Sequence, residues 1–444
     1  MARDTIRTYY ALAATQAFSA LGSRISGLAI GIWIFQQTGH ATPLTLVAFF
    51  ALLPSVLGGG LAGAVADRFD RRLVMVCADA GQAVGTVLLV ISFSSGAFQL
   101  WHLYALAVSQ AAFGTVQTPA FQATISMLTV DAQRDRANAI VQMIGPTAGI
   151  VAPAIAGLVY AAAGVVGAVV IDLATFLVAV VVVLNLRIPI PAATKEGAAL
   201  RASVWRQAFD GLRYLAARPT LFGFGLYATA FNCIVGVATV LLTPYVLART
   251  GSGTALGVVL AALNGGAIVG SILAGAAPRR GLRIHGMMAG VSAASVFLAI
   301  SGIAREPWSL GASLFFFTGA ISFTSVPYMS IMQAKIAPDV QGRVFAAMGQ
   351  LSSLTIPIAF LAAGPLADRV FEPAVARADW NRLAPLFGAE PGAGMGLLLA
   401  LSGVLSLMLS VVAYFASPIR RIETSLPDYV PETTDVGAEG AGTS

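Results

Sequence analysis

Long runs of hydrophobic residues, separated by short polar stretches, make up almost the whole of this chain. A helical run of about 20 residues is enough to cross the ~30 Å hydrocarbon core of a bilayer. The pattern therefore predicts an all-α polytopic membrane protein with twelve transmembrane helices, and not the short alternating strands of a membrane β-barrel. The runs cover residues 9–36, 42–66, 73–95, 101–129, 136–162, 165–186, 220–248, 254–277, 283–304, 308–337, 342–371 and 393–416.

The longest polar stretch between runs, residues 187–219, divides them into two groups of six. We expect an N-terminal bundle over 1–186, a cytoplasmic linker with an amphipathic helix over 187–219, and a C-terminal bundle over 220–416. Residues 417–444 contain prolines, glycines and acids, and are predicted to form a disordered cytoplasmic tail. Placing the N-terminus in the cytoplasm puts 20 of the 26 Lys and Arg residues on that side, so both termini are predicted to be cytoplasmic.

The two halves also repeat one another in sequence. Residues 61–64 and 273–276 both read Leu-Ala-Gly-Ala at an offset of 212, whereas Arg136 and Arg343 correspond at an offset of 207. The offset changes at a single loop, residues 67–72, which is shorter in the second copy. The halves are therefore predicted to be parallel repeats, an arrangement found among transporters.

Composition narrows the possible functions. Hydrophobic residues make up 57% of the chain and charged residues only 10%, well below the ~25% of soluble proteins. Cys77 and Cys233 lie in apolar runs and the three histidines are far apart, so neither a disulfide nor a metal site is predicted. The net charge of +6 comes from boundary loops and does not indicate nucleic-acid binding. Without a phosphate-binding loop, no ATPase is predicted, so transport energy is expected from an ion gradient. We expect neither enzymatic activity nor a cofactor.

The loop after the second run carries the most specific motif. Its spacing, Gly63-x-x-x-Asp67-Arg68-x-x-Arg71-Arg72, resembles the signature loop between helices 2 and 3 of the major facilitator superfamily. The stretches 131–138, 333–345, 364–373 and 423–428 resemble the drug/proton antiporter-like branch that includes macrolide efflux pumps and siderophore exporters. The resemblance covers about residues 9–430 and implies the major facilitator fold.

The resemblance also implies a cytoplasmic gate. In that family the matching aspartate and arginine form a charge network with the opposite bundle, which breaks when the cytoplasmic side opens. We interpret six residues as members of this network: Asp67, Arg68, Arg71, Arg72, Arg136 and Arg343. The alternative is that these charges only set the topology.

Three charged residues lie well inside the runs, away from their ends, where each costs at least ~2.5 kcal/mol to insert. Asp172 and Asp79 are candidates for proton coupling, and the alternative for Asp79 is pairing with a loop arginine such as Arg72. Arg24 is a candidate for the substrate cavity, and its alternative is an ion pair with Asp172.

Polar residues within the runs are the other cavity candidates, because an apolar wall with a few polar groups suits a large lipophilic molecule. They are Gln16, Gln110, Gln117, Tyr227, Asn232, Asn264, Tyr328 and Gln333, and the alternative for each is helix packing. In the fifth run, the stretch with Gly149, Pro153 and Gly157 resembles the glycine–proline motif of drug/proton antiporters, with alanine in place of two glycines. Small residues predict that this helix packs closely on the opposite bundle.

The sequence thus predicts a monomeric secondary transporter in the lipid bilayer of a bacterial inner membrane. It is expected to export a lipophilic small molecule in exchange for protons. The alternatives are export of a siderophore or a self-made metabolite, nutrient uptake by the same fold, and a non-transporting membrane sensor or scaffold. The repeated, gated halves argue against a scaffold, which needs no symmetric gate.

Overall fold

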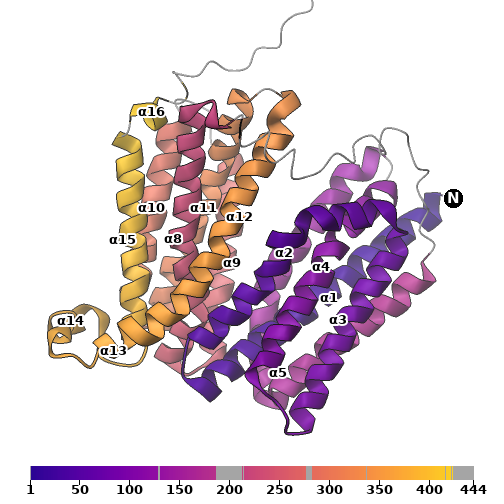
Figure 1. Ribbon diagram of the computed structural model, residues 1–444, viewed down its shortest axis with the longest axis horizontal. Helices are drawn as coiled ribbons and strands as arrows, with labels where there is room; N and C mark the ends of the chain where they lie inside the picture. The colour runs from indigo at the N-terminus through magenta and orange to yellow at the C-terminus, as the bar shows by residue number, and fades with distance from the viewer. Residues whose placement is uncertain are drawn as a thin grey trace, which may run out of the picture.

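The computed structural model describes residues 2–128, 131–186, 213, 215–276, 283–336, 338–415, 417–421 and 423. These residues form two groups of helices, which meet near one end of the molecule and diverge toward the other (Figure 1). We call these the closed end and the splayed end. The predicted linker helix, within 187–219, falls almost entirely outside the described residues.

The N-terminal half is built from five long helices, and the last of them crosses the membrane twice. At 55 residues, α5 would be about 80 Å long if straight, far more than one crossing needs. Its path breaks at Gly164, where φ is 65° and ψ is −167°, a conformation that glycine adopts without strain. The helices are α1 (Ala2–Thr38), α2 (Thr42–Arg68), α3 (Arg71–Ser94), α4 (Leu100–Leu128) and α5 (Asp131–Asn185).

The C-terminal half has six long helices and a small lobe at the closed end. The long helices are α8 (Pro219–Thr250), α9 (Gly253–Ala276), α10 (Arg283–Ile303), α11 (Pro307–Lys335), α12 (Pro338–Leu366) and α15 (Ala393–Phe415). The lobe contains a π-helical turn (Ala367–Phe371), α13 (Glu372–Ala374), a 3₁₀ turn (Ala378–Arg382) and α14 (Ala384–Phe387). In the lobe, the indole of Trp380 donates to the carbonyl of Gly388 at 2.8 Å.

Twelve membrane crossings follow from these helices. Among the described residues, ten helices are long and apolar enough to span a bilayer, with α5 counted once. The second crossing of α5 and the 29-residue α4 complete the two six-helix bundles. The predicted fold class is therefore confirmed.

The two halves repeat the same helix pairing. In the N-terminal half α1 packs on α5 and α2 packs on α4, and in the C-terminal half α8 packs on α12 and α9 packs on α11. The halves meet mainly through α5 against α9 and α2 against α12. These two seams are themselves equivalent under the repeat, so an approximate twofold relation runs through the interface.

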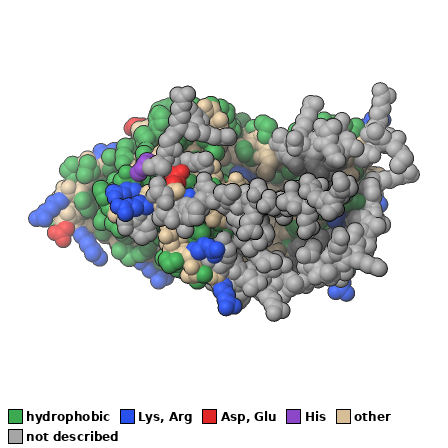
Figure 2. All heavy atoms as spheres, turned by 90° about the horizontal axis from the view of Figure 1, so that it is seen from above, with side chains coloured by type: hydrophobic (Ala, Val, Ile, Leu, Met, Phe, Trp, Pro, Cys, Tyr) green, Lys and Arg blue, Asp and Glu red, His purple; other side chains and the backbone are tan. Residues whose placement is uncertain are grey.

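Basic side chains mark the splayed end. The end of α2, the start of α3 and the end of α11 all lie there, with Arg68, Arg72 and Lys335. Seen from this end, the described surface carries several Lys and Arg side chains and few acidic ones (Figure 2).

The predicted disorder from residue 417 is wrong for the first part of the tail. Residues Ser417–Arg420 form the short helix α16, and Glu423 accepts from the backbone N–H of Ile284 at 3.0 Å. The Nζ of Lys335 donates to the carbonyl of Glu423 at 2.8 Å, so this part of the tail is held against α10 and α11. Residues 424–444 lie outside the described part of the chain.

Candidate functional site

Small residues bring α5 into contact with α9 at the first seam. A Cβ added to Gly257 of α9 would lie 3.0 Å from the carbonyl oxygen of Pro153, and one added to Gly157 would lie 3.5 Å from the backbone of α9. At Gly149 an added Cβ would lie 2.6 Å from the side-chain oxygen of Asn264. The three helix-5 residues named from the sequence therefore all lie against the opposite half. An added Cβ would force a shift at Gly149 and be tight at Gly257, but at Gly157 it would make only ordinary contact.

Arg24 lies at the same seam. Its guanidinium Nη1 is 3.4 Å from the Cβ position of Gly149, beside Asn264, whose amide nitrogen donates to the Gly149 carbonyl at 3.1 Å. The side chain of Arg24 is exposed, and no carboxylate among the described residues lies within 4 Å of it. The alternative ion pair with Asp172 is thus not formed, and Arg24 and Asn264 bring two polar groups to the interface.

A second seam joins α2 and α12 at the closed end through Asp368. One carboxylate oxygen accepts from the backbone N–H of Ala41 at 2.9 Å, and the other accepts from the N–H of Thr42 at 2.7 Å and its hydroxyl at 2.5 Å. The Nδ1 atom of His40 lies 3.9 Å from the same carboxylate. Gly364, one helical turn before Asp368, packs against Thr42 so closely that an added Cβ would lie 2.6 Å from its Cα.

Asp368 supplies the cap that α2 lacks. The N-cap residue Ala41 has no side chain that can accept the free N–H groups of the first turn. The carboxylate from the other half fills this role and carries the charge that a helix N-terminus favours. In the sequence, Asp368 belongs to the family-like stretch 364–373, and no local pattern connects it to Thr42, 326 positions away.

Buried polar side chains link α3 to α4 inside the N-terminal half. Asp79 is fully buried, and its Oδ1 accepts from the amide nitrogen of Gln117 at 2.7 Å. Gln82 donates to Gln117 at 3.1 Å, and the backbone carbonyl of Gln82 accepts from Thr86 at 3.0 Å. Gln110 continues the series by donating to the Thr86 hydroxyl at 3.2 Å. Among the described residues, the second oxygen of Asp79 has no hydrogen-bond partner.

Asp172 lies at the other end of this series. It is 1% exposed, its Oδ1 accepts from the hydroxyl of Ser23 at 2.9 Å, and the amide of Gln110 lies beside it. We name Asp79, Gln82, Thr86, Gln110, Gln117, Asp172 and Ser23 the polar network. Gln110 and Gln117 therefore bond to other helices of their own half, and their role as cavity residues stays a prediction. Asp79 is bonded to Gln117 and not to Arg72.

The hydrogen bonds described for Arg71 and Arg72, at the loop between α2 and α3, stay within their own half. Arg71 donates to the carbonyl of Ala123 at 3.1 Å, and Arg72 donates to the carbonyls of Val183, at 3.2 Å, and Leu184. Arg68 is exposed. The side chains of Asp67, Arg136 and Arg343 lie outside the described set.

The remaining cavity candidates are scattered. The hydroxyl of Tyr227 lies 3.0 Å from that of Ser410, inside the C-terminal half, and Tyr328 packs on Phe224 with ring centroids 5.3 Å apart. Asn232 and Gln333 are exposed. The side-chain nitrogen of Gln16 is buried with no partner among the described residues.

Metal chemistry has no candidate within the described part of the chain, which contains no group of three or more His, Cys, Asp or Glu side chains that could hold an ion.

Comparisons with known proteins point to one family. Residues 12–360 match the family model described as Major Facilitator Superfamily. The chain is 27% identical over 373 residues to macrolide efflux protein A of Streptococcus pyogenes, covering 82% of this chain and 90% of that protein. It is 28% identical over 366 residues to the multidrug efflux pump Tap of Mycobacterium tuberculosis, covering 79% and 84% of the two chains.

Solved structures share the fold. A bacterial homologue of the human lysosomal transporter Spinster, in an inward-facing and unoccupied conformation, superposes with a TM-score of 0.71 at 16% identity over 96% of this chain and 99% of that one. The nucleoside transporter NupG superposes with a TM-score of 0.66 at 13% identity over 91% and 98%.

Proposed function

The chain belongs to the Major Facilitator Superfamily, and we propose that it exports a lipophilic small molecule from a bacterial cell in exchange for protons. Membership makes it a multi-pass membrane transporter of a small molecule. The efflux proteins among its relatives support export of a drug or secondary metabolite. We infer that the protein acts as a monomer, because one chain contains both halves of the transport unit.

The observation that carries the proposal is the difference between the two ends. The halves are joined by close backbone contacts and by the Asp368 cap at the closed end, and they diverge at the other. With the positive-inside rule applied to the sequence, the splayed end and both termini face the cytoplasm. In this conformation the protein can bind substrate that arrives from the cytoplasm. Export then requires the seams at the closed end to open while the splayed end closes.

The polar network supports proton coupling. A charge in the membrane is costly, and a buried carboxyl group whose partners are neutral amides and hydroxyls can gain or lose a proton without breaking an ion pair. Asp172 and Asp79 both satisfy this description. Asp172 is the stronger candidate, because its partner Ser23 adjoins Arg24, whose guanidinium reaches the α5–α9 seam.

Transport in inside-out vesicles tests the proposal. We express the protein in a pump-deficient host and prepare inside-out vesicles from it. We expect the vesicles to accumulate erythromycin when their interior is more acidic than the medium, and to lose it when this proton gradient is dissipated. Asp172→Asn should reduce gradient-driven uptake at least tenfold while counterflow exchange persists. Asp379→Asn, an exposed change in the lobe, is the matched control. Equal uptake with and without the proton gradient would contradict proton coupling.

The side chain of Arg24 also suits one alternative class of substrate. An exposed guanidinium at the seam binds a carboxylate as well as a carbonyl oxygen, which also fits an acidic siderophore. Protection of the host against iron-chelator toxicity, without protection against erythromycin, would favour that substrate.

A further inference from the structure

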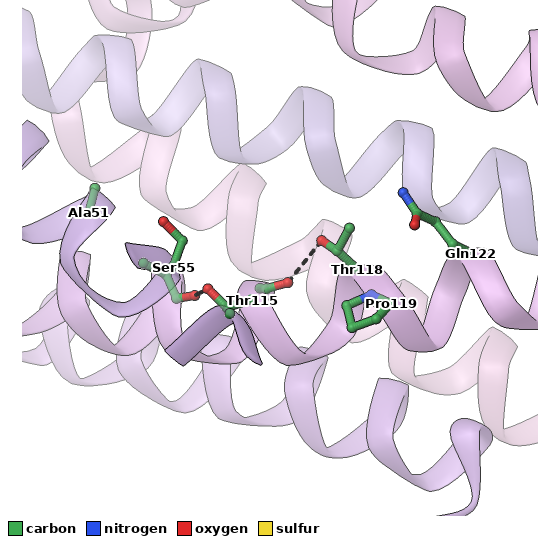
Figure 3. A pocket seen from close by; sticks show the side chains of 9 residues that line it. Ala51, Ser55, Thr115, Thr118, Pro119 and Gln122 are labelled. Atoms are coloured by element: carbon green, nitrogen blue, oxygen red, sulfur yellow. Dashed lines mark hydrogen bonds between the residues drawn. The ribbon is translucent and has the colours of Figure 1, made fainter. Parts of the chain in front are cut away.

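A groove between α2 and α4 contains polar groups that the sequence patterns did not single out (Figure 3). Its volume of about 550 Å³ falls within the range of small-molecule sites. The helix α2 also packs on α12, so the groove adjoins a seam between the halves. It is lined by Ala51, Ser55, Gly59, Ala111, Gly114, Thr115, Thr118, Pro119 and Gln122.

The spacing of these residues explains the groove. The α4 residues recur at intervals of three and four, which places them on one face of the helix, and the α2 residues recur at intervals of four. Alanine and glycine leave room between the helices at these positions. No atom lies within 4 Å of a Cβ added to Gly114 or Gly59. The opposite face of α4 holds Gln117, which belongs to the polar network.

The hydroxyl groups of the groove have their donor capacity already in use. Ser55 donates to the carbonyl of Leu52 at 2.7 Å, Thr115 donates to the carbonyl of Ala111 at 2.6 Å, and Thr118 donates to that of Gly114 at 3.0 Å. A hydroxyl has one hydrogen and two lone pairs. Each of the three hydroxyls therefore offers the groove only acceptor lone pairs. Gln122 adds a carboxamide, which can both donate and accept, and the lining contains no charged side chain.

We propose that the α2–α4 groove is a substrate subsite, and that it binds O–H or N–H groups of a lipophilic molecule. A ligand donor can bond to these hydroxyls without disturbing the helix, whereas a ligand carbonyl would have to displace a backbone carbonyl from each hydroxyl hydrogen. The three hydroxyls thus complement Arg24, which offers only donors. This proposal rests on the proposed function, since it identifies part of the site of an exporter.

Two dyes of nearly the same shape test the preference for donors. Rhodamine 123 carries N–H groups, and tetramethylrhodamine methyl ester is a similar lipophilic cation whose nitrogens are fully methylated. We expect the detergent-solubilised full chain to bind rhodamine 123 at least fivefold more tightly. Thr115→Val with Thr118→Val should weaken rhodamine 123 binding about tenfold and change binding of the methylated dye less than twofold.

Filling the groove gives an independent measurement. Gly114→Leu should weaken the binding of both dyes at least tenfold, because the new side chain occupies space that is open in the folded protein. The matched control is Gly275→Leu, at an exposed glycine of α9 that also has no atom within 4 Å of an added Cβ. Size-exclusion profiles identical to those of the unmodified chain exclude misfolding of either variant.

The outcomes separate this proposal from the proposed function. Equal effects of the threonine changes on both dyes, or failure of rhodamine 123 to bind, contradict the subsite. In another outcome, rhodamine 123 binds more tightly than the methylated dye and is weakened by the groove substitutions, while vesicles accumulate neither erythromycin nor rhodamine 123. That result supports the subsite and contradicts export. An export rate that Gly114→Leu leaves unchanged contradicts the subsite but not the proposed function.

Discussion

The two ends of this molecule use their charged residues in different ways. At the closed end, the carboxylate of Asp368 crosses from one half to the other and holds the first turn of α2. At the splayed end, Arg71 and Arg72 donate to backbone carbonyls of their own half. In this conformation charge joins the halves at the closed end, whereas at the splayed end these two arginines stabilise one half internally.

The comparison indicates how the conformation is selected. The free energy of each state depends on which contacts between halves are made, and the contacts at the two ends need not form together. In the proposed cycle, opening the closed end breaks the Asp368 cap, and closing the splayed end gives the loop arginines partners across the interface. The balance between ends can therefore be shifted by changes at either one.

The largest shift is expected from a bulky residue at the second seam. Gly364→Leu should prevent α12 from approaching α2, because even a Cβ would lie 2.6 Å from the Cα of Thr42. We expect distances between spin labels at Ser95 and Asp379, in a background without Cys77 and Cys233, to lengthen in most molecules. The control is Gly349→Leu, on the same helix but with nothing within 4 Å of an added Cβ. An unchanged distance distribution would show that the seam does not depend on close packing.

A smaller shift is expected when the cap is removed. Asp368→Ala loses three hydrogen bonds, and one such bond to a charged group contributes about 1.5–3 kcal/mol. The ratio of open to closed molecules at the closed end should rise roughly a hundredfold or more. Thr42→Val keeps both backbone bonds and loses one of the three, so it should raise the ratio only about tenfold. If both variants match the unmodified chain, the cap does not hold the seam.

Asp67→Asn tests the other end. If Asp67 acts only when the splayed end is closed, the change should slow export several-fold, and label distances between Phe69 and Ala217 should favour the splayed state. Membrane insertion and the label distances at the closed end should stay as they are in the unmodified protein. Full export by this variant would remove Asp67 from the proposed gate.

The smallest effect is expected at the first seam. Asn264→Ala removes one neutral hydrogen bond to the Gly149 carbonyl, which contributes about 1 kcal/mol. The open population at the closed end should rise about threefold to fivefold. Ser271→Ala, which removes a hydroxyl bonded only within α9, serves as the control. A shift as large as that of Asp368→Ala would mean that the first seam carries most of the interface energy.

Features that depend on runs of neighbouring residues were predictable from the sequence. The twelve crossings follow from hydrophobic length, and the close contact of α5 with α9 follows from the small residues around Pro153. The family followed from the spacing in the loop at 63–72, since the resemblance and the family model agree.

Features that depend on which face of a helix meets which neighbour were not predictable. Gln110 and Gln117 share a face, as their spacing of seven indicates, but that face turns toward α3 and its polar groups. Tyr227 likewise faces α15 through Ser410. Inside a membrane a polar side chain is held by any neighbour that satisfies it, so polarity alone does not distinguish a cavity wall from a helix contact.

The cap on α2 has a consequence for how this protein can change over generations. Because Ala41 cannot cap its own helix, positions 41 and 368 share a single task and are not free to vary independently. A serine or aspartate at position 41 would let the helix begin without help, and position 368 could then lose its carboxylate without leaving those amides unsatisfied. We expect aligned relatives to show these two positions as a co-varying pair, one from each half of an ancient duplication.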